Sequence, residues 1–384
     1  MAKIRFWQRM VTPHMSGLAE ALALRGHCVE YVAEEILSGE RAAMGWTTPE
    51  LRGVELHLIG SPNEAAKLAG LARPGTVHLT QGFRSNGLVA HAQRQIRRRS
   101  EDRHFVVMET VQEKGPIGEL KHCLYGWHLH RWAGPLDGVL SIGHRTTSWL
   151  EAVAPRSLAI HPFAYFLPEA QHSARLLESS PRFRFLFVGQ LIPRKRVEAL
   201  LSALVVLDKF DFELDLIGEG PEGERLRVLA EGLLPGRIRF LGTLPMSEVP
   251  AQMSKADCLV LPSMHDGWGA VVSEAMLVGT PVVCSTACGA AGVVDASGCG
   301  GTFDFDNPDA FQSALKSQLS RGKVTPAVRV GLANWARCLG AEAGAAYVER
   351  ILEARIFGGA HPTTPWERDS EFARLTADGF EETL

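Results

Sequence analysis

The chain has 384 residues, of which 46% are hydrophobic and 22% charged, values ordinary for a globular protein of two or three domains. This composition excludes a coiled coil, collagen or long disorder as the main organisation. Lys and Arg number 40 against 43 Asp and Glu, so the formal net charge is −3 and the chain lacks an overall basic field for nucleic acid.

The charge is unevenly distributed, because residues 1–165 carry a net +4 and the remainder −7. That asymmetry fits either an anionic partner of the first half or ordinary solvation. The seven cysteines form no C-x-x-C pair, so we expect buried thiols in a reducing compartment and no metal site. No secretory h-region and no run of about 18 apolar residues occurs. We therefore expect a cytoplasmic protein, or one peripheral to the inner face of a membrane.

Apolar runs alternate with helical patterns through the first half, which is typical of an open parallel sheet covered by helices. Gly26 ends the first predicted helix. The predicted strands are Lys3–Phe6, Val29–Ala33, Val54–Ile59, Thr76–Thr80, Phe105–Met108 and Gly138–Ser141, and the predicted helices are Ser16–Arg25 and Arg145–Val153.

Four prolines interrupt this alternation in residues 155–182, after which a second alternation begins. Its predicted strands are Phe183–Val188, Phe212–Ile217, Arg237–Leu241, Cys258–Leu261 and Pro281–Cys284, and its predicted helices are Arg196–Leu207, Glu222–Leu233, Gly269–Leu277, Pro308–Leu319 and Trp335–Ile356.

The pattern predicts an α/β protein with two doubly wound domains and a site in the crevice between them. The first domain spans residues 1–165, a linker 166–182, and the second domain 183–356. The polar tail at 357–384 either wanders or packs back on the first domain.

The most informative segment runs from Leu261 to Val283 and contains Asp266-Gly267-Trp268-Gly269 and Glu274-Ala275-Met276. An apolar strand ends there and a glycine-rich turn opens a helix. The N–H groups at such a helix start attract an anionic group. Two carboxylates beside them are acceptors for paired hydroxyls. Taken singly, Asp266 is better explained as a helix cap and Glu274 as a residue on a solvated face.

The whole string resembles the retaining, nucleotide-sugar-dependent enzymes of glycosyltransferase family 4, which have the GT-B fold of two Rossmann-like domains. The resemblance rests on Asp266 and Glu274 with seven residues between them, and on the Gly279-Thr280-Pro281-Val282 that follows. Asp-Gly-Trp-Gly resembles a subgroup that includes enzymes of surface-polysaccharide and lipopolysaccharide assembly. The family more often has Glu at the first acidic position.

The resemblance implies roles for these residues. Glu274 would hold the ribose hydroxyls of the donor, and Asp266 would contact donor-sugar hydroxyls. The backbone at Gly267, Trp268 and Gly269 would approach the sugar and its diphosphate.

A second segment, Phe185 to Val197, places Gly189 at the end of an apolar strand and a basic cluster before a helix. Cations there suit a diphosphate whose charge grows during transfer. In the family an Arg follows the glycine and a Lys comes five residues later. Lys195 matches the Lys, Gln190 replaces the Arg, and Arg194 is the candidate to compensate; an exposed basic helix start is the alternative.

A third segment carries Gly218 and Gly220, followed by Phe240-Leu241-Gly242. In the family these turns line the nucleotide pocket, so Gly218, Gly220 and Leu241 are expected to contact the donor.

The first domain matches the family less closely. Thr12-Pro13-His14-Met15-Ser16 stands where a glycine-rich loop is usual, so His14 either contacts acceptor or phosphate or is a local loop residue. Glu109, at the end of a strand where relatives have a His, is the candidate to touch the sugar or orient the acceptor hydroxyl.

Arginines 94, 97, 98, 99 and 103 suggest a basic helical face, which either meets anionic lipid or is simply solvated. Two nearby tryptophans, Trp127 and Trp132, either line an acceptor groove or, as the default, pack in the core.

We expect a retaining glycosyltransferase of the hexosyltransferase type, with catalytic candidates Lys195, Arg194, Asp266, Glu109 and His14. The donor is a UDP-, GDP- or ADP-sugar, and the acceptor a glycan, a lipid-linked sugar or a small molecule. No metal or other cofactor is expected. The alternatives are a nucleotide-sugar epimerase and a non-catalytic nucleotide-sugar-binding protein. A dehydrogenase is disfavoured because no Gly-x-Gly-x-x-Gly follows the first strand.

Overall fold

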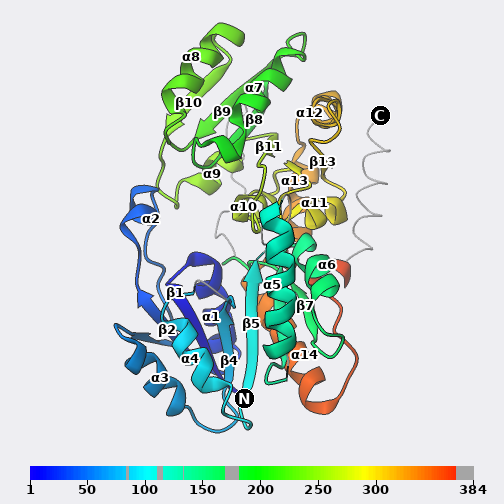
Figure 1. The fold of residues 1–384 in the computed structure, drawn as a ribbon. Coiled ribbons are helices and arrows are strands. Elements are labelled where there is room, and N and C mark those ends of the chain that lie inside the picture. The colour runs from blue at the N-terminus through cyan, green and yellow to red at the C-terminus, as the bar shows by residue number, and fades with distance from the viewer. Residues whose placement is uncertain (84–85, 110–115, 133, 169–180, 369–384) are drawn as a thin grey trace. The chain divides into compact units, whose positions relative to one another are not determined.

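The computed structural model describes residues 1–83, 86–109, 116–132, 134–168 and 181–368 (Figure 1). The chain forms two compact units. The first comprises Met1–Gly39, Thr48–Pro168 and Gly340–Pro365. The second comprises Glu40–Thr47 and the described parts of Glu169–Leu339 and Trp366–Leu384.

The first unit is built on a parallel sheet of seven strands in the order β3-β2-β1-β4-β5-β6-β7. The order reverses between β1 and β4, which makes the sheet doubly wound. Its strands are β1 (Lys3–Met10), β2 (Cys28–Glu35), β3 (Val54–Leu58), β4 (Val77–Gln81), β5 (Arg103–Glu109), β6 (Gly138–Ile142) and β7 (Ile160–Phe163). Its helices are α1 (Pro13–Leu24), α3 (Pro62–Gly70), α4 (Val89–Ile96), α5 (Pro116–Trp132), α6 (His144–Val153) and α14 (Ala341–Phe357). Helix α2 (Gly39–Ala43) follows β2, and from Glu40 on it groups with the second unit.

Two apolar clusters attach these helices to the sheet. Trp7, Val32 and Ile59 pack under α3 and α4, and Val106 and Leu150 belong to the cluster under α5 and α6. Fully burying one such side chain contributes about 1.5–3 kcal/mol, so the clusters hold these helices against the sheet.

The last strand of this sheet lies inside the proline-rich stretch that sequence patterning interpreted as a break. Strand β7 contains Pro162 and pairs with β6 as the edge of the sheet. An edge strand tolerates proline because one side of its backbone needs no partner. The helices α3, α4 and α5 were also not predicted as such.

The second unit has a parallel sheet of six strands in the order β10-β9-β8-β11-β12-β13, again doubly wound. The strands are β8 (Phe183–Val188), β9 (Phe212–Ile217), β10 (Ile238–Gly242), β11 (Cys258–Leu261), β12 (Val282–Ser285) and β13 (Gly300–Phe303). The helices are α7 (Val197–Val205), α8 (Gly223–Leu233), α9 (Val249–Met253), α10 (Ala270–Leu277), α11 (Ala291–Ser297), α12 (Ala310–Arg321) and α13 (Pro326–Ala336), with 3₁₀ turns η1 (Pro193–Lys195) and η2 (Arg337–Leu339) and a final helix α15 (Pro365–Arg368).

The long helix predicted over Trp335–Ile356 is wrong. Helix α13 ends at Ala336, and Gly340 adopts an extended conformation (φ −76°, ψ 157°) before α14 begins. Two ion pairs attach α14 to the α1 end of the first unit, because Glu349 lies 2.5 Å from Arg25 and 2.8 Å from His27. The helix that was expected to complete the second domain therefore belongs to the first unit.

The boundaries differ from those expected at two other places. Phe166 and Leu167, assigned to the linker, pack in the first unit, where the N–H of Ala341 donates to the Leu167 carbonyl at 2.8 Å. The start of the tail also groups with this unit, and the ring of His361 stacks on that of His161 at 4.5 Å. Residues 169–180 of the expected linker and 369–384 of the expected tail lie outside the described residues. Among the described residues no helix is long and apolar enough to cross a membrane.

Candidate functional site

The candidate site lies at the C-terminal edge of the second sheet, where the strand order reverses between β8 and β11. The segment from Gly189 to Lys195 follows β8, and the segment from Met264 to Gly269 comes shortly after β11. The N–H of Met264 donates to the Arg194 carbonyl at 2.8 Å, which joins the two segments. Ligands of doubly wound folds bind at such a reversal, because the two loops diverge there and leave space.

Asp266 is the electrostatic centre of this edge. Its Oδ2 accepts a hydrogen bond from Lys195 Nζ at 2.8 Å, and its Oδ1 lies 3.3 Å from an Arg194 guanidinium nitrogen that also donates to the His265 carbonyl. Burial acts to raise the pKa of Asp266, but the charge and hydrogen bond of Lys195 and the charge of Arg194 outweigh it and lower the pKa. The carboxylate is therefore ionised, and it holds both predicted cations at the turn.

The turn from Gly267 to Gly269 leads into α10 with its N–H groups unused. Gly269 is the N-cap, in the left-handed region at φ +84°, with no side-chain cap. Across the part of the chain that the structure describes, the backbone N–H groups of residues 267–271 have no hydrogen-bond acceptor. A row of free N–H groups at a helix start is an anion-binding arrangement.

Trp268 is held in the interior. Its side chain is 2% exposed and its indole N–H donates to Ser273 Oγ at 2.9 Å. The indole anchors the turn to α10, and only the backbone of this residue is available to a ligand.

Glu274 lies on α10, five residues after the N-cap Gly269. The residue is half-buried, and the protein packed around its carboxyl raises its pKa to about 7. Within the described residues its carboxylate has neither a hydrogen bond nor an ion pair. An unpartnered buried carboxylate is costly, so such a group usually has a function.

The glycines of the other two segments permit a close backbone approach. A Cβ on Gly218 would lie 2.1 Å from the Gly189 carbonyl oxygen, and one on Gly220 would lie 2.4 Å from that of Leu191. The N–H of Gly218 donates to the Gly242 carbonyl at 2.8 Å, next to Leu241, which is 36% exposed. The structure therefore brings the three predicted donor-binding segments to one edge of one sheet.

Gln190 follows Gly189 at this edge and is partly exposed. Its side-chain amide has no hydrogen-bond partner among the described residues. The neighbouring positive charge comes from Arg194, whose side chain turns toward Asp266.

In the first unit, Tyr165 links the two predicted residues His14 and Glu109. The Tyr165 hydroxyl donates to a Glu109 carboxylate oxygen, and the rings of Tyr165 and His14 stack at 4.9 Å. Glu109 ends β5 and His14 lies in the first turn of α1, so both lie at the C-terminal edge of the first sheet. Sequence reasoning missed Tyr165, because it follows the unrecognised strand β7.

The arginines of the expected basic face are mostly engaged within the first unit, and Arg97 follows α4 rather than lying on it. Arg97 lies over the Trp132 ring at 3.9 Å. Arg99 pairs with Asp102, and Arg103 with Asp137. The interpretation as one continuous helical face is wrong.

The two tryptophans of α5 differ. Trp132 packs against an apolar cluster as the default interpretation expects. Trp127 is 67% exposed, so core packing is the wrong interpretation for it.

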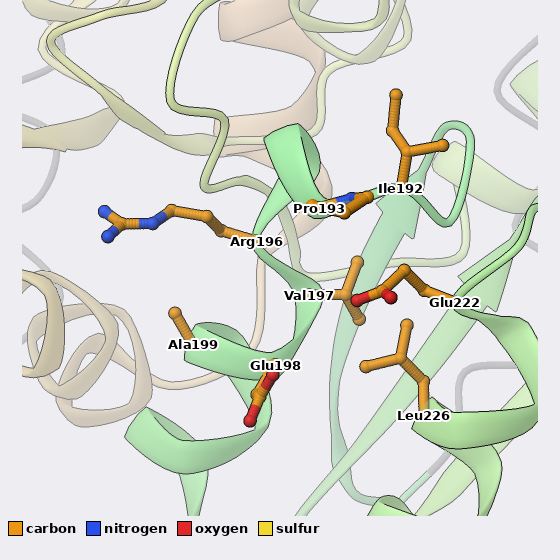
Figure 2. Close-up of a pocket in the computed structure, with 8 residues that line it drawn as sticks. All are labelled: Ile192, Pro193, Arg196, Val197, Glu198, Ala199, Glu222 and Leu226. Atoms are coloured by element: carbon orange, nitrogen blue, oxygen red, sulfur yellow. The ribbon is translucent and has the colours of Figure 1, made fainter.

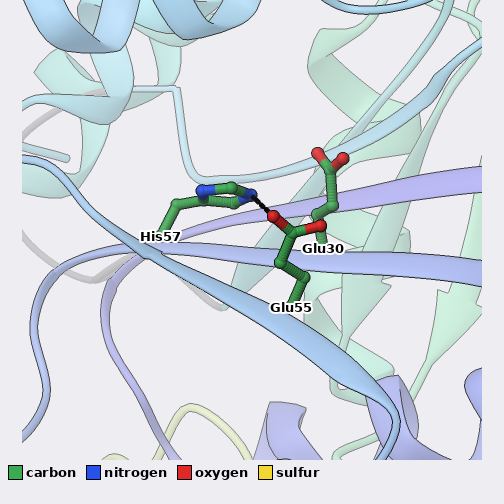
Figure 3. Close-up of side chains that lie close together, drawn as sticks. All are labelled: Glu30, Glu55 and His57. Carbon is green, nitrogen blue, oxygen red and sulfur yellow. Dashed lines mark ion pairs between the residues drawn. The ribbon is translucent and has the colours of Figure 1, made fainter.

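One group of potential metal ligands occurs within the described ranges, where Glu30, Glu55 and His57 place ligand atoms within 4.8 Å of one another (Figure 3). His57 pairs with Glu55 at 3.3 Å. Glu30 is already paired with Lys3 and Arg5, whose positive charges disfavour a cation there. We assign no metal to this group.

A pocket of about 300 Å³ lies beside the starts of α7 and α8 (Figure 2). Two carboxylates in its wall, Glu198 and Glu222, each accept a hydrogen bond from Arg225 at 2.7 Å. Its lining contains none of the charged site residues described above; it consists of Ile192, Pro193, Arg196, Val197, Glu198, Ala199, Glu222 and Leu226.

Comparison with known proteins agrees with this geometry. Residues 169–327 match the family model described as "Glycosyl transferases group 1". The 2-deoxystreptamine glucosyltransferase of Streptomyces kanamyceticus is 36% identical over 51% of this chain and 54% of its own length. The GDP-mannose-dependent alpha-mannosyltransferase of Mycolicibacterium smegmatis is 26% identical over 70% of this chain and 74% of its own. The chain thus spans about half the length of the first of these relatives.

The solved structure of the lipopolysaccharide outer core galactosyltransferase WaaB superposes with a TM-score of 0.68 at 15% identity, covering 93% of this chain and 99% of that one. Two Rossmann-like parallel-sheet domains make the fold GT-B, which confirms the expected fold class. Residues 169–327, which make up less than half of the chain, are similar to the Glycosyl transferases group 1 family.

Proposed function

We propose that this protein is a glycosyltransferase that moves a sugar from a nucleotide-sugar donor to an acceptor hydroxyl. The observation that carries the proposal is the meeting of Lys195, Arg194 and the free N–H groups of residues 267–271 at the strand-order reversal of the second sheet. Cations and oriented N–H groups together are the chemistry that recognises a diphosphate.

These groups would also favour the chemical step. Breaking the bond between sugar and diphosphate leaves negative charge on phosphate oxygens, and donors fixed in place stabilise that charge without reorganising. The Lys195 ammonium has three N–H groups, of which Asp266 accepts one, so others remain for phosphate oxygens. Asp266 keeps the cation in position before the donor arrives.

Glu274 would accept hydrogen bonds from the two ribose hydroxyls of the donor. Two vicinal hydroxyls match the two oxygens of one carboxylate, and they would replace the partners that the fold does not supply. Binding of the nucleotide would therefore relieve part of the burial cost of this charge.

The first domain would bind the acceptor. His14, Tyr165 and Glu109 offer two aromatic faces and a carboxylate, a combination that suits the apolar faces and hydroxyls of a sugar. Retention of the anomeric configuration follows from the family resemblance, with the leaving diphosphate helping to deprotonate the acceptor.

The donor is proposed to be a UDP-, GDP- or ADP-sugar, and the pathway polysaccharide or glycoconjugate synthesis, as for the lipopolysaccharide galactosyltransferase that shares the fold. A thermal-shift screen with UDP, GDP and ADP, followed by incubation of the matching sugar donors with candidate acceptors, tests this. NMR of the product gives its anomeric configuration. A wild-type protein that binds none of the three nucleotides would refute the proposal, and a donor epimerised without an acceptor would establish the epimerase instead.

A peripheral association with anionic membrane stays a prediction, and it would depend on Arg94 and Arg98, which are exposed. Co-sedimentation with vesicles containing anionic lipid measures it. Arg94→Glu with Arg98→Glu should reduce binding, and wild-type protein that stays in the supernatant at low salt would remove this part of the proposal.

A further inference from the structure

A short segment after β12, Thr286–Ala290, runs alongside the turn from Asp266 to Gly269. The N–H of Asp266 donates to the Ala287 carbonyl at 3.2 Å, and the N–H of Gly289 donates to the Asp266 carbonyl at 3.0 Å. The N–H of Ala290 donates to the Trp268 carbonyl at 2.9 Å. These bonds fix the backbone of the turn from one side.

The two backbones approach too closely for side chains at two positions. A Cβ on Gly289 would lie 1.9 Å from the Gly267 carbonyl oxygen, which is backbone and cannot move aside. A Cβ on Gly269 would lie 2.7 Å from Cys288 Sγ.

Cys288 adds a side-chain bond to this contact. Its side chain is fully buried, and its thiol donates to the Trp268 carbonyl at 2.9 Å. That carbonyl therefore receives two hydrogen bonds from the same segment, one from the thiol and one from Ala290.

The bonds made by the carbonyls decide where the neighbouring N–H groups point. In a trans peptide the C=O of one residue and the N–H of the next point in opposite directions, and no described peptide is cis. Because the Asp266 carbonyl points to Gly289, the N–H of Gly267 points away from Thr286–Ala290. The Trp268 carbonyl likewise turns the N–H of Gly269 away.

We propose that Thr286–Ala290 positions the turn so that the N–H groups of Gly267 and Gly269 face the donor diphosphate, with Cys288 as a positioning residue. The inference rests on the proposed function, because it takes a nucleoside diphosphate as the ligand. It assigns a role to a loop that itself contributes no charge to the site.

The test compares three variants of the 384-residue chain by calorimetric titration with UDP, GDP and ADP. Cys288→Ala removes the thiol donor, and Cys288→Ser keeps a hydroxyl that can donate to the same carbonyl. Cys299→Ala is the matched control, because Cys299 is also buried but lies between α11 and β13, outside this contact.

We expect Cys288→Ala to weaken nucleotide binding about tenfold, the effect of losing about one hydrogen bond that orients the turn. Cys288→Ser should restore most of the affinity, and Cys299→Ala should lower the melting temperature without changing affinity. Equal affinities in Cys288→Ala and Cys299→Ala would overturn the inference, because the thiol would then be only a filler of the core.

Amide hydrogen exchange separates this inference from the proposed function. In the absence of nucleotide, Cys288→Ala should speed exchange at Asp266 and Gly289, whose N–H groups make the described bonds. Unchanged exchange there would overturn the positioning role. A wild-type protein that binds no nucleotide would instead refute the proposed function, while exchange still reports on the segment.

Discussion

Replacing Glu274 by Gln should make the unliganded protein more stable while weakening its binding of nucleotide. The carboxyl has an ordinary pKa of 4.5, and burial without a partner raises it to about 7 in the folded chain. Glutamine has nearly the same shape and no charge to bury. A residue whose removal stabilises the fold but harms binding is kept for function.

The gain in stability that Glu274→Gln produces depends on pH. A carboxyl whose pKa is higher in the folded state holds its proton more tightly when folded, so it opposes folding increasingly as pH rises from 4.5 through 7. The difference in pKa corresponds to a cost of about 3 kcal/mol at pH 8 and less than about 1 kcal/mol at pH 5. Glu274→Gln should recover that cost.

Thermal unfolding without ligand measures the effect. In a domain of 150–250 residues, a change of one kcal/mol in the free energy of unfolding shifts the melting temperature by about 2–4 °C. The variant should therefore melt about 6–12 °C above wild type at pH 8, with a much smaller difference at pH 5. Nucleotide affinity should fall about 10- to 100-fold, since hydrogen bonds to a charged group are lost. Glu231→Gln, at an exposed position on α8, is the control and should change neither quantity.

A variant no more stable than wild type at pH 8 would refute the reasoning, because the carboxylate would then have a partner or adequate solvation. A variant that is stabilised but binds nucleotide normally would leave the burial argument intact and remove the ribose contact.

Three further substitutions test the site and the fold. Lys195→Ala should lower turnover about 100-fold or more, because a fixed cation at the leaving diphosphate is lost; single-turnover rates at saturating donor measure it, and a normal rate would remove Lys195 from the mechanism. Gly344→Ala should destabilise the first domain by about 1–3 kcal/mol in urea unfolding, since its Cβ would lie 2.3 Å from the buried ring of Phe166. Gly232→Ala on α8, where a Cβ meets nothing within 4 Å, should instead stabilise by about 0.5–1 kcal/mol; the same sign for both glycines would show that α14 does not pack as described.

Short-range patterns in the sequence predicted five of the six strands of the second sheet; β13 (Gly300–Phe303) was not among them. The strands predicted at Phe183–Val188, Phe212–Ile217 and Cys258–Leu261 coincide with β8, β9 and β11. An apolar run that ends at a glycine is a local signal, because strand propensity and turn geometry depend on the residues of that segment alone. The order of the motifs then indicated the fold class and the three segments expected to bind the donor.

Only the tertiary structure decided which distant groups meet. Lys195 and Asp266 are 71 residues apart in the sequence, and Tyr165 and Glu109 are 56 apart. Helix α14 follows the second unit in the chain but packs in the first. Gly340 separates it from the preceding helix, and the missing side chain of Gly344 leaves room for the Phe166 ring. Likewise the sequence indicates only that Cys288 is a small buried residue. The fold is what places its thiol against the Trp268 carbonyl. Periodicity records which residues are buried, but the partner of a buried polar group depends on how separate elements pack, and no local pattern contains that information.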